Sequence, residues 1–323
     1  MKLLLCSNIK LGAVSTEKLD IQLSHKWQSV RSTRFDDLMD HAARSNAHYV
    51  LLAGQLFGQA RVTESLLDKL FELARDNADI QLIALLIPDE FLRISYRKDI
   101  PENLHVIDVH QVGAYQVDEL SLYVRNNAVE VQLSEADILS IGQNTQGYYT
   151  ASLGAEEYCI PIMEPIGFED AADTKSGYSL LTATENTPAK YSIHEHAAYV
   201  YKAIEIRIQS TDDQKEILRK INSATREIQR NCFLRVTLTG RSAFGLTIDS
   251  AALKVQLQNR FFFVDVYNNT VMDTDEDAFE TDISLRSEFV RLALADESLS
   301  ESERNRIISC GWNALSEKEV YEE

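Results

Sequence analysis

The sequence lacks the features that mark membrane, secreted and zinc-binding proteins. No apolar stretch in its 323 residues approaches the ~20 residues that a membrane-spanning helix needs. The apolar run in Met1–Cys6 is too short for a signal peptide and no cleavage site follows, so we expect a strand there. The cysteines show no C-x-x-C spacing, which argues against a zinc site or a disulfide framework. They are Cys6, Cys159, Cys232 and Cys310. We therefore expect a cytoplasmic protein without membrane association.

Positive charge is also scarce. The chain has 32 Lys and Arg residues against 50 Asp and Glu residues, a formal net charge of −18. A protein that holds duplex DNA unaided usually has a basic surface. Tight unaided DNA binding is therefore not expected unless one face of the molecule gathers the basic residues.

Several catalytic and metal-binding motifs are absent or incomplete. No G-x-x-x-x-G-K-[ST] loop occurs, so the chain is expected to carry no ATPase of its own, and no G-x-S-x-G elbow occurs either. Asp273, Asp275 and Asp277 begin a calcium-type loop, but Ala278 and Ser284 stand where Gly and Glu are needed. We interpret that segment as a solvated acidic loop.

A pair of histidines, His194 and His196, could place two imidazoles on one face of a strand. Because no further ligand is evident near them, we interpret them as structural or exposed residues rather than a metal site.

Apolar segments alternate between strand and helix patterns along the first part of the chain. The run Tyr49–Ala53 ends at Gly54 and is typical of a buried parallel strand followed by a tight turn. Residues 2–7 and 80–87 predict two more strands, and helices are predicted over 31–46 and 62–77. This order predicts an α/β fold with a largely parallel sheet. Ligands bind beyond the carboxyl ends of such strands, so we expect the site after Gly54.

The later part of the chain predicts a second, smaller unit. A hairpin is predicted around Asn126-Asn127, then a last strand over 176–181 and a polar linker that contains Pro188. The following segments predict a β-α-β-α-β order typical of a small two-layer α+β domain, with strands over 203–208, 234–238 and 261–266 and helices over 212–230 and 250–258. Two helices follow, over 283–295 and from Ser300, which forms a capping box with Glu303.

Several motifs occur in the order typical of one family. Leu51–Gly58 has the pattern Leu-Leu-Ala-Gly-X-Leu-Phe-X, and Ser7–Gly12 has the frame S-x-x-x-L-G. Phe233–Arg241 and the ending through Gly311–Leu315 add to the pattern. The chain thereby resembles the SbcD/YhaO branch of calcineurin-type metallophosphoesterases, which are DNA repair nucleases.

The resemblance implies three regions. A metallophosphoesterase-type α/β sandwich would occupy 1–185, a small α+β capping domain 190–280 and a C-terminal helical region 281–323. It also implies a homodimer through the phosphoesterase domain and an SMC-like ABC-ATPase as partner.

The metal ligands of that family are almost all replaced here. Asn8 and Gln55 stand where the family has Asp, and Lys10 stands where it has His. Pro88-Asp89-Glu90 replaces Asn-His-Asp, and Gln143 falls where a His is expected. Since an amide is a weaker ligand than a carboxylate and an ammonium repels a divalent cation, we expect no metal and no catalytic residue here.

Two other interpretations of these residues remain open. Lys10 and the amides could bind an anion such as phosphate without cleaving it, although polar filling of an inactive cleft is favoured. Alternatively, the chain is an active Mn-dependent exonuclease whose site is rebuilt from Asp89, Glu90 and His105 or His110.

One stripe of basic residues is a candidate DNA contact. At 100° per residue, Lys215, Arg219, Arg226 and Arg230 fall within about 60° of one another on the predicted helix over 212–230. Arg241 follows nearby. A phosphate backbone could bind this stripe weakly, or it is simply a solvated helix face.

The C-terminal helices carry more apolar residues than a detached tail would keep exposed. The candidates for docking the ATPase partner are Phe289, Leu292, Ile307 and Trp312. Alternatively, these side chains pack back on the chain's own capping domain.

Overall fold

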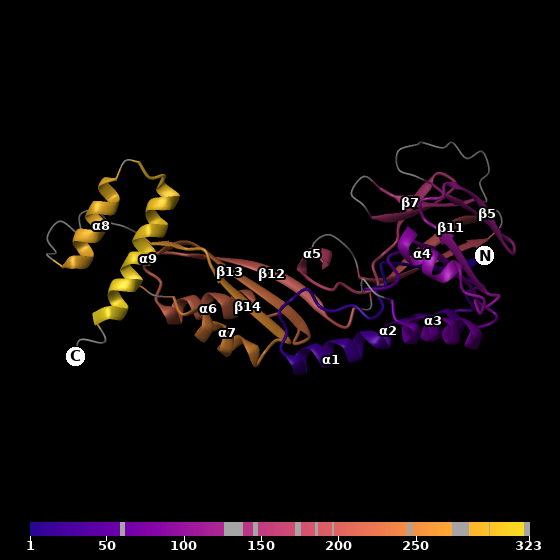
Figure 1. The fold of residues 1–323 in the computed structure, drawn as a ribbon, viewed down its shortest axis with the longest axis horizontal. Coiled ribbons are helices and arrows are strands. Elements are labelled where there is room, and N and C mark those ends of the chain that lie inside the picture. The colour runs from indigo at the N-terminus through magenta and orange to yellow at the C-terminus, as the bar shows by residue number, and fades with distance from the viewer. Residues whose placement is uncertain are drawn as a thin grey trace. The chain divides into compact units, whose positions relative to one another are not determined.

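The computed structural model describes residues 1–58, 62–125, 138–144, 148–171, 176–184, 187–195, 197–243, 246, 248–272, 284–296 and 298–319. The chain forms two compact units, Met1–Tyr199 and Val200–Glu323. Both combine helices with sheets, so the predicted mixed α/β class is confirmed (Figure 1).

A six-stranded sheet forms the centre of the first unit. Its spatial order is β11-β10-β1-β2-β3-β4. The four strands on one side of the order are parallel, whereas β10 and β11 run antiparallel to their neighbours. The strands are β1 (Lys2–Ser7), β2 (Tyr49–Gly54), β3 (Gln81–Leu86), β4 (Leu104–Asp108), β10 (Gly177–Thr184) and β11 (Thr187–Glu195). The linker predicted around Pro188 is wrong, because these residues form the edge strand β11.

Helices cover one face of this sheet. Their apolar residues pack against alternate residues of β1, β2 and β3 in one core cluster, as the helical spacing of Phe35, Leu38 and Met39 illustrates. The helices of the unit are α1 (Ile21–Ser32), α2 (Arg34–Arg44), α3 (Glu64–Asp76), α4 (Pro88–Ser95) and the short α5 (Phe168–Ala171). The helix predicted over 31–46 begins later, since Arg31 belongs to α1, which ends at Ser32, and Thr33 separates α1 from α2.

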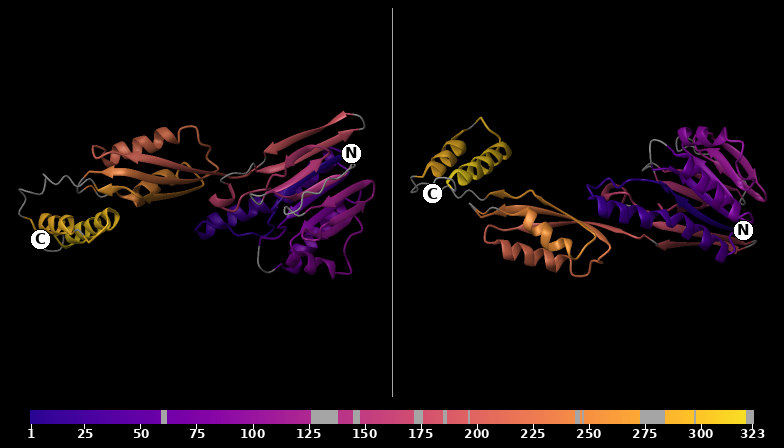
Figure 2. Two further views of the ribbon diagram at one scale, coloured as in Figure 1. Left: turned by 90° about the horizontal axis from the view of Figure 1, so that it is seen from above. Right: turned by 60° about the horizontal axis from the view of Figure 1, so that its bottom comes forward.

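A second sheet covers the opposite face. Its order is β5-β6-β7-β8-β9, and its inward residues form a core with the other alternate residues of the first sheet, such as Leu5, Leu51 and Ile83. Helices, six-stranded sheet and five-stranded sheet therefore form three layers (Figure 2). The strands are β5 (Gly113–Val117), β6 (Leu120–Val124), β7 (Leu139–Gln143), β8 (Tyr149–Leu153) and β9 (Glu156–Cys159). The predicted turn at Asn126-Asn127 lies outside the described residues.

The second unit has the predicted β-α-β-α-β order. Strands β12, β13 and β14 are parallel and adjacent, and β15 pairs with the end of β13. Both crossover helices pack on one face, where Ile217, Ile221, Leu253 and Leu257 meet the strands. The elements are β12 (Val200–Ile208), α6 (Gln214–Ala224), β13 (Cys232–Ser242), α7 (Ser250–Gln258), β14 (Phe263–Asn268) and β15 (Val271–Met272).

Two helices end the chain, α8 (Leu285–Ala295) and α9 (Glu301–Glu319). The predicted capping box forms, because the Ser300 N–H donates to Glu303 Oε2 at 3.0 Å and the Glu303 N–H donates to Ser300 Oγ at 3.4 Å. Among the described residues, none of the helices is long and apolar enough to cross a membrane.

Candidate functional site

The structure places the candidate residues where the first sheet's strands end. Asn8 and Lys10 follow β1, Gln55 follows β2, and Asp89 and Glu90 lie in the first turn of α4, directly after β3. The loops after β1 and β2 run side by side. Their backbones are joined by hydrogen bonds from Asn8 to Ala53 at 2.9 Å, from Lys10 to Gln55 at 3.3 Å and from Leu11 to Leu56 at 2.7 Å. The sequence therefore located this edge of the sheet correctly.

The side chain of Asn8 forms a hydrogen bond with the loop after β2. Asn8 has a φ of +46°, a left-handed conformation that Asn tolerates better than most residues. Its Oδ1 accepts the backbone N–H of Gln55 at 3.0 Å. The amide oxygen of Asn8 thus stabilises the turn after β2.

The carboxylate of Glu90 also forms hydrogen bonds with the loop after β2. Its two oxygens accept the backbone N–H groups of Leu56 and Phe57 at 2.8 and 2.9 Å. The residue is 5 % exposed, and burial raises the pKa of its carboxyl above the ordinary value, while the two N–H donors act in the opposite direction. Asp89, one residue earlier, is exposed. Glu90 therefore connects α4 to the loop after β2 through these two hydrogen bonds.

The ring of Tyr149, from the five-stranded sheet, packs against the turn after β2. Tyr149 at the start of β8 is 3 % exposed, and a Cβ added to Gly54 would lie 2.5 Å from its Cε2 atom and 2.6 Å from Asn8 Oδ1. Burial raises the pKa of Tyr149 to about 12, the charge of Glu90 adds to this, and the hydrogen bond with Gln143 opposes it. Gln143, at the end of β7, thus forms a side-chain hydrogen bond with Tyr149. Tyr149 was not predicted from the sequence, where its only signal is an aromatic side chain shortly after Gln143.

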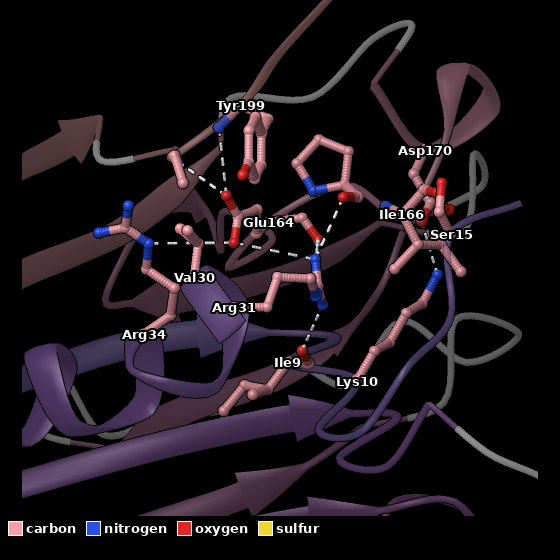
Figure 3. Close-up of polar contacts among 12 residues, drawn as sticks. Ile9, Lys10, Ser15, Val30, Arg31, Arg34, Glu164, Ile166, Asp170 and Tyr199 are labelled. Atoms are coloured by element: carbon pink, nitrogen blue, oxygen red, sulfur yellow. Dashed lines mark hydrogen bonds and ion pairs between the residues drawn. The ribbon is translucent and has the colours of Figure 1, made fainter. Parts of the chain in front are cut away.

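Lys10 is held by an acidic residue of α5. Its Nζ lies 2.7 Å from Asp170 Oδ2, which also accepts the Ile166 N–H at 3.2 Å (Figure 3). Lys10 and Asn8 both line a small cavity of about 160 Å³ that Asp170, Glu164 and Glu169 line as well. With three carboxylates in its wall, this cavity does not favour the phosphate-type anion proposed for Lys10.

A buried ion cluster lies next to these residues. Arg31, at the end of α1, donates from Nη1 to the carbonyls of Glu164 and Pro165 at 2.9 and 3.1 Å, and from Nη2 to Ile9 at 3.1 Å. Glu164 is 2 % exposed and lies between Arg31 and Arg34, 3.9 and 4.0 Å away (Figure 3). Its Oε1 accepts the N–H groups of Ala198 and Tyr199 at 2.7 and 3.3 Å.

The donor set does not fit a pair of divalent cations. A two-metal site needs several carboxylates and imidazoles directed at one point. Here Asn8 Oδ1 and both oxygens of Glu90 accept backbone N–H groups, and Lys10 brings a positive charge. Within the described part of the chain, no group of three or more His, Cys, Asp or Glu residues could hold a metal ion.

The residues of the rebuilt-site alternative do not all lie at one end of the sheet. His105 pairs with Ile83 near the amino ends of the strands, and its Nε2 lies 2.7 Å from Gln81 Oε1. Glu90 follows the carboxyl end of β3, at the opposite end of the sheet. His110 lies in the turn after β4, where its backbone N–H donates to Asp108.

The histidine pair and the acidic calcium-type segment lie partly or wholly outside the described residues. His194 lies on β11 with its ring 4.8 Å from that of His41 and 5.5 Å from that of Tyr178, in an aromatic cluster. His196 and the acidic segment with Asp273, Asp275 and Asp277 lie outside the described residues.

The predicted basic stripe does not lie on one helix. Helix α6 ends at Ala224, six residues before the predicted end, so Arg226 and Arg230 belong to the following turns. Thr225 is the reason, because its buried hydroxyl donates to the Ile221 carbonyl while Arg260 binds the Thr225 carbonyl. Of the two candidates on α6, Lys215 is exposed and Arg219 pairs with Glu216 at 2.6 Å.

Basic residues nevertheless concentrate in this part of the chain. Residues 200–272 contain 11 Lys and Arg and 7 Asp and Glu, a formal charge of +4. Because the whole chain has a formal charge of −18, the residues outside 200–272 have a formal charge of −22. Arg226, Arg230 and Arg241 are exposed there.

The docking candidates divide into two pairs. Phe289 packs between α8 and α9, where a Cβ added to Gly311 would lie 2.2 Å from its ring. The Cζ atom of Arg286 lies 5.4 Å from the centroid of the Trp312 ring. Leu292 and Ile307 are instead 65 % and 39 % exposed. The helical hairpin therefore uses Phe289 and Trp312 for its own core and leaves Leu292 and Ile307 outside it.

Comparison of the sequence with protein-family models and with curated proteins finds no match.

Proposed function

We propose that this chain is a catalytically degenerate SbcD/YhaO-like subunit that acts as a scaffold or regulator in a nuclease–ATPase complex for DNA repair or processing. The order of the motifs supports this proposal, as does the layering of helices, six-stranded sheet and five-stranded sheet, which suits a metallophosphoesterase-type sandwich. The homodimer implied by the resemblance belongs to the same proposal.

One observation carries the proposal of lost catalysis. The polar atoms at the motif positions serve the backbone, since Asn8 and Glu90 together accept three N–H groups from the loop after β2. Tyr149 packs against the same turn. A metal would have to displace these bonds, and the loss of the two to Glu90 would leave buried N–H donors unsatisfied.

An exonuclease assay tests this proposal. The full chain is incubated with Mn²⁺ and a labelled linear duplex, beside the Gln55→Ala variant and the variant of the exposed Asp89, Asp89→Asn, purified in the same way. We expect no Mn²⁺-dependent release of nucleotides by the chain. A contaminating nuclease would give equal activity in all samples, whereas activity that disappears in either variant would contradict the proposal.

Nucleic-acid binding by the second unit is a second candidate function. The charge of +4 over residues 200–272, within a chain of −18, favours it. Such binding would rest on phosphate contacts from exposed residues such as Arg226, Arg230 and Arg241 rather than on a helical stripe.

Salt-dependent binding tests this second candidate. Affinity for a labelled duplex is measured by fluorescence anisotropy over a series of salt concentrations. Replacing Arg226 and Arg230 by Ala should weaken binding and reduce the slope of log K against log[salt] by about 2. The control removes two exposed charges from the first unit, Arg93 and Lys98. Binding without salt dependence, or equal losses in both variants, would eliminate the candidate.

The ATPase partner remains part of the proposal. The exposed Leu292 and Ile307 are the docking residues that the hairpin does not use itself, so we assign the contact with an SMC-like ABC-ATPase to them.

A further inference from the structure

A separate cavity of about 230 Å³ lies in the helical layer of the first unit. Its wall combines the loop after β1 with residues of α1, α2 and α3 and with Met163 and Glu164. The proposed scaffold function makes no use of it. Pockets of about 300–1,000 Å³ usually hold drug-sized ligands, so this cavity suits a smaller molecule.

Most of the wall is apolar. Phe35, Leu11, Ile9 and Met163 are buried residues that belong to the unit's core cluster, and Leu66 is half-buried at the edge of α3. Arg31 fixes two sides of the wall to each other, because it binds the Ile9 carbonyl and the carbonyls of Glu164 and Pro165. The wall is therefore preformed, and an apolar ligand body would gain contact without ordering a loop.

The charged groups that line the cavity are mostly cations. Lys10, Arg31, Arg34 and Lys69 contribute to the wall. Glu164 is the acidic residue that lines it within the described part of the chain, and its charge is compensated by two backbone N–H groups and two guanidinium groups.

The acidic partners of the other cations lie further out. Asp170, Asp37 and Asp36 pair with Lys10, Arg34 and Lys69, and their side chains are 30 %, 41 % and 43 % exposed. The side chains of Lys10, Arg34 and Lys69 are 14 %, 17 % and 33 % exposed. These three carboxylates do not line the cavity, so its wall presents four cationic groups and Glu164 among the described residues.

We propose that this cavity binds a small monocarboxylate with an apolar body. The apolar wall would hold the body, and the carboxylate would lie toward Lys69 and Arg34. A neutral analogue would keep the apolar contact and lose the charge attraction, and an ammonium analogue would be repelled.

Calorimetry with three probes that share one carbon skeleton tests the proposal on the full chain. The probes are 3-phenylpropionate, 3-phenylpropanol and 3-phenylpropylammonium. We expect 3-phenylpropionate to bind at least about tenfold more tightly than the alcohol, and the ammonium probe to bind least. Equal affinity for the acid and the alcohol, or no heat from 3-phenylpropionate, would overturn the proposal.

Two variants and one control variant test whether 3-phenylpropionate binds in this cavity. Leu66→Trp should fill the cavity and abolish binding of 3-phenylpropionate. Lys69→Gln should weaken it severalfold, whereas Lys98→Gln, which removes an exposed charge that does not line the cavity, should leave it unchanged. If Leu66→Trp does not fold, the comparison of the two lysine variants still decides, since equal affinities would overturn the assignment.

Discussion

Replacing Gly54 by Ala is expected to destabilise the first unit by about 2–5 kcal/mol, because it adds backbone strain to a steric clash. Gly54 has a φ of +87°, which an L-residue rarely adopts. The new methyl group would also meet Tyr149 at 2.5 Å and Asn8 at 2.6 Å. The free energy of unfolding in urea measures the effect.

Gly154 offers a matched control for this substitution. It also has a positive φ, +61°, but nothing lies within 4 Å of a Cβ added there. Gly154→Ala should therefore cost about 1 kcal/mol from backbone strain alone. If Gly54→Ala cost no more than Gly154→Ala, the close packing of Tyr149 against the turn would be wrong.

Replacing Arg31 by Met is expected to destabilise the chain by about 3–5 kcal/mol, the cost of removing one partner from a buried ion pair. Arg31 is 9 % exposed and binds three carbonyl oxygens, and its charge partly offsets the rise that burial causes in the pKa of Glu164. Arg34→Met is the control. Its guanidinium lies 4.0 Å from Glu164 and pairs with the exposed Asp37, so its loss should cost about 1 kcal/mol.

The penalty of Arg31→Met should also depend on pH. Burial raises the pKa of Glu164 above its ordinary value, and Arg31 and Arg34 oppose this. A carboxyl whose pKa is raised on folding contributes stability at low pH and loses it as pH rises through the folded-state pKa. Without Arg31 that pKa rises further, so the penalty should grow from about pH 5 to about pH 7.5. Equal penalties for both variants at both pH values would show that Glu164 does not depend on Arg31.

The strong apolar periodicities predicted the framework well. The strand ending at Gly54, the helices with Leu38 and Leu67 on their buried sides and the β-α-β-α-β order of the second unit all follow from residues that face a core. Elements with few buried residues were missed. Helix α1 buries only Trp27 and Arg31, and the edge strand β11 is rich in polar residues, so neither shows a clear period.

The candidate site was predicted in position but not in detail. Asn8, Gln55 and Glu90 could be placed because each follows a strand of a parallel sheet. The sequence could not show that Glu90 binds the N–H groups of Leu56 and Phe57, because those bonds depend on the path of a loop. It could not show Tyr149 either, which comes from the other sheet. Long-range juxtapositions of this kind leave no periodic signal.

Calorimetric titration of the metal-stripped full chain with Mn²⁺ tests the central claim most directly. We predict no binding in the micromolar range, because the oxygens of Asn8 and Glu90 already accept backbone N–H groups and Lys10 adds a positive charge. Micromolar binding of about two ions per chain, the stoichiometry of a two-metal phosphoesterase site, would contradict the account and favour the active exonuclease.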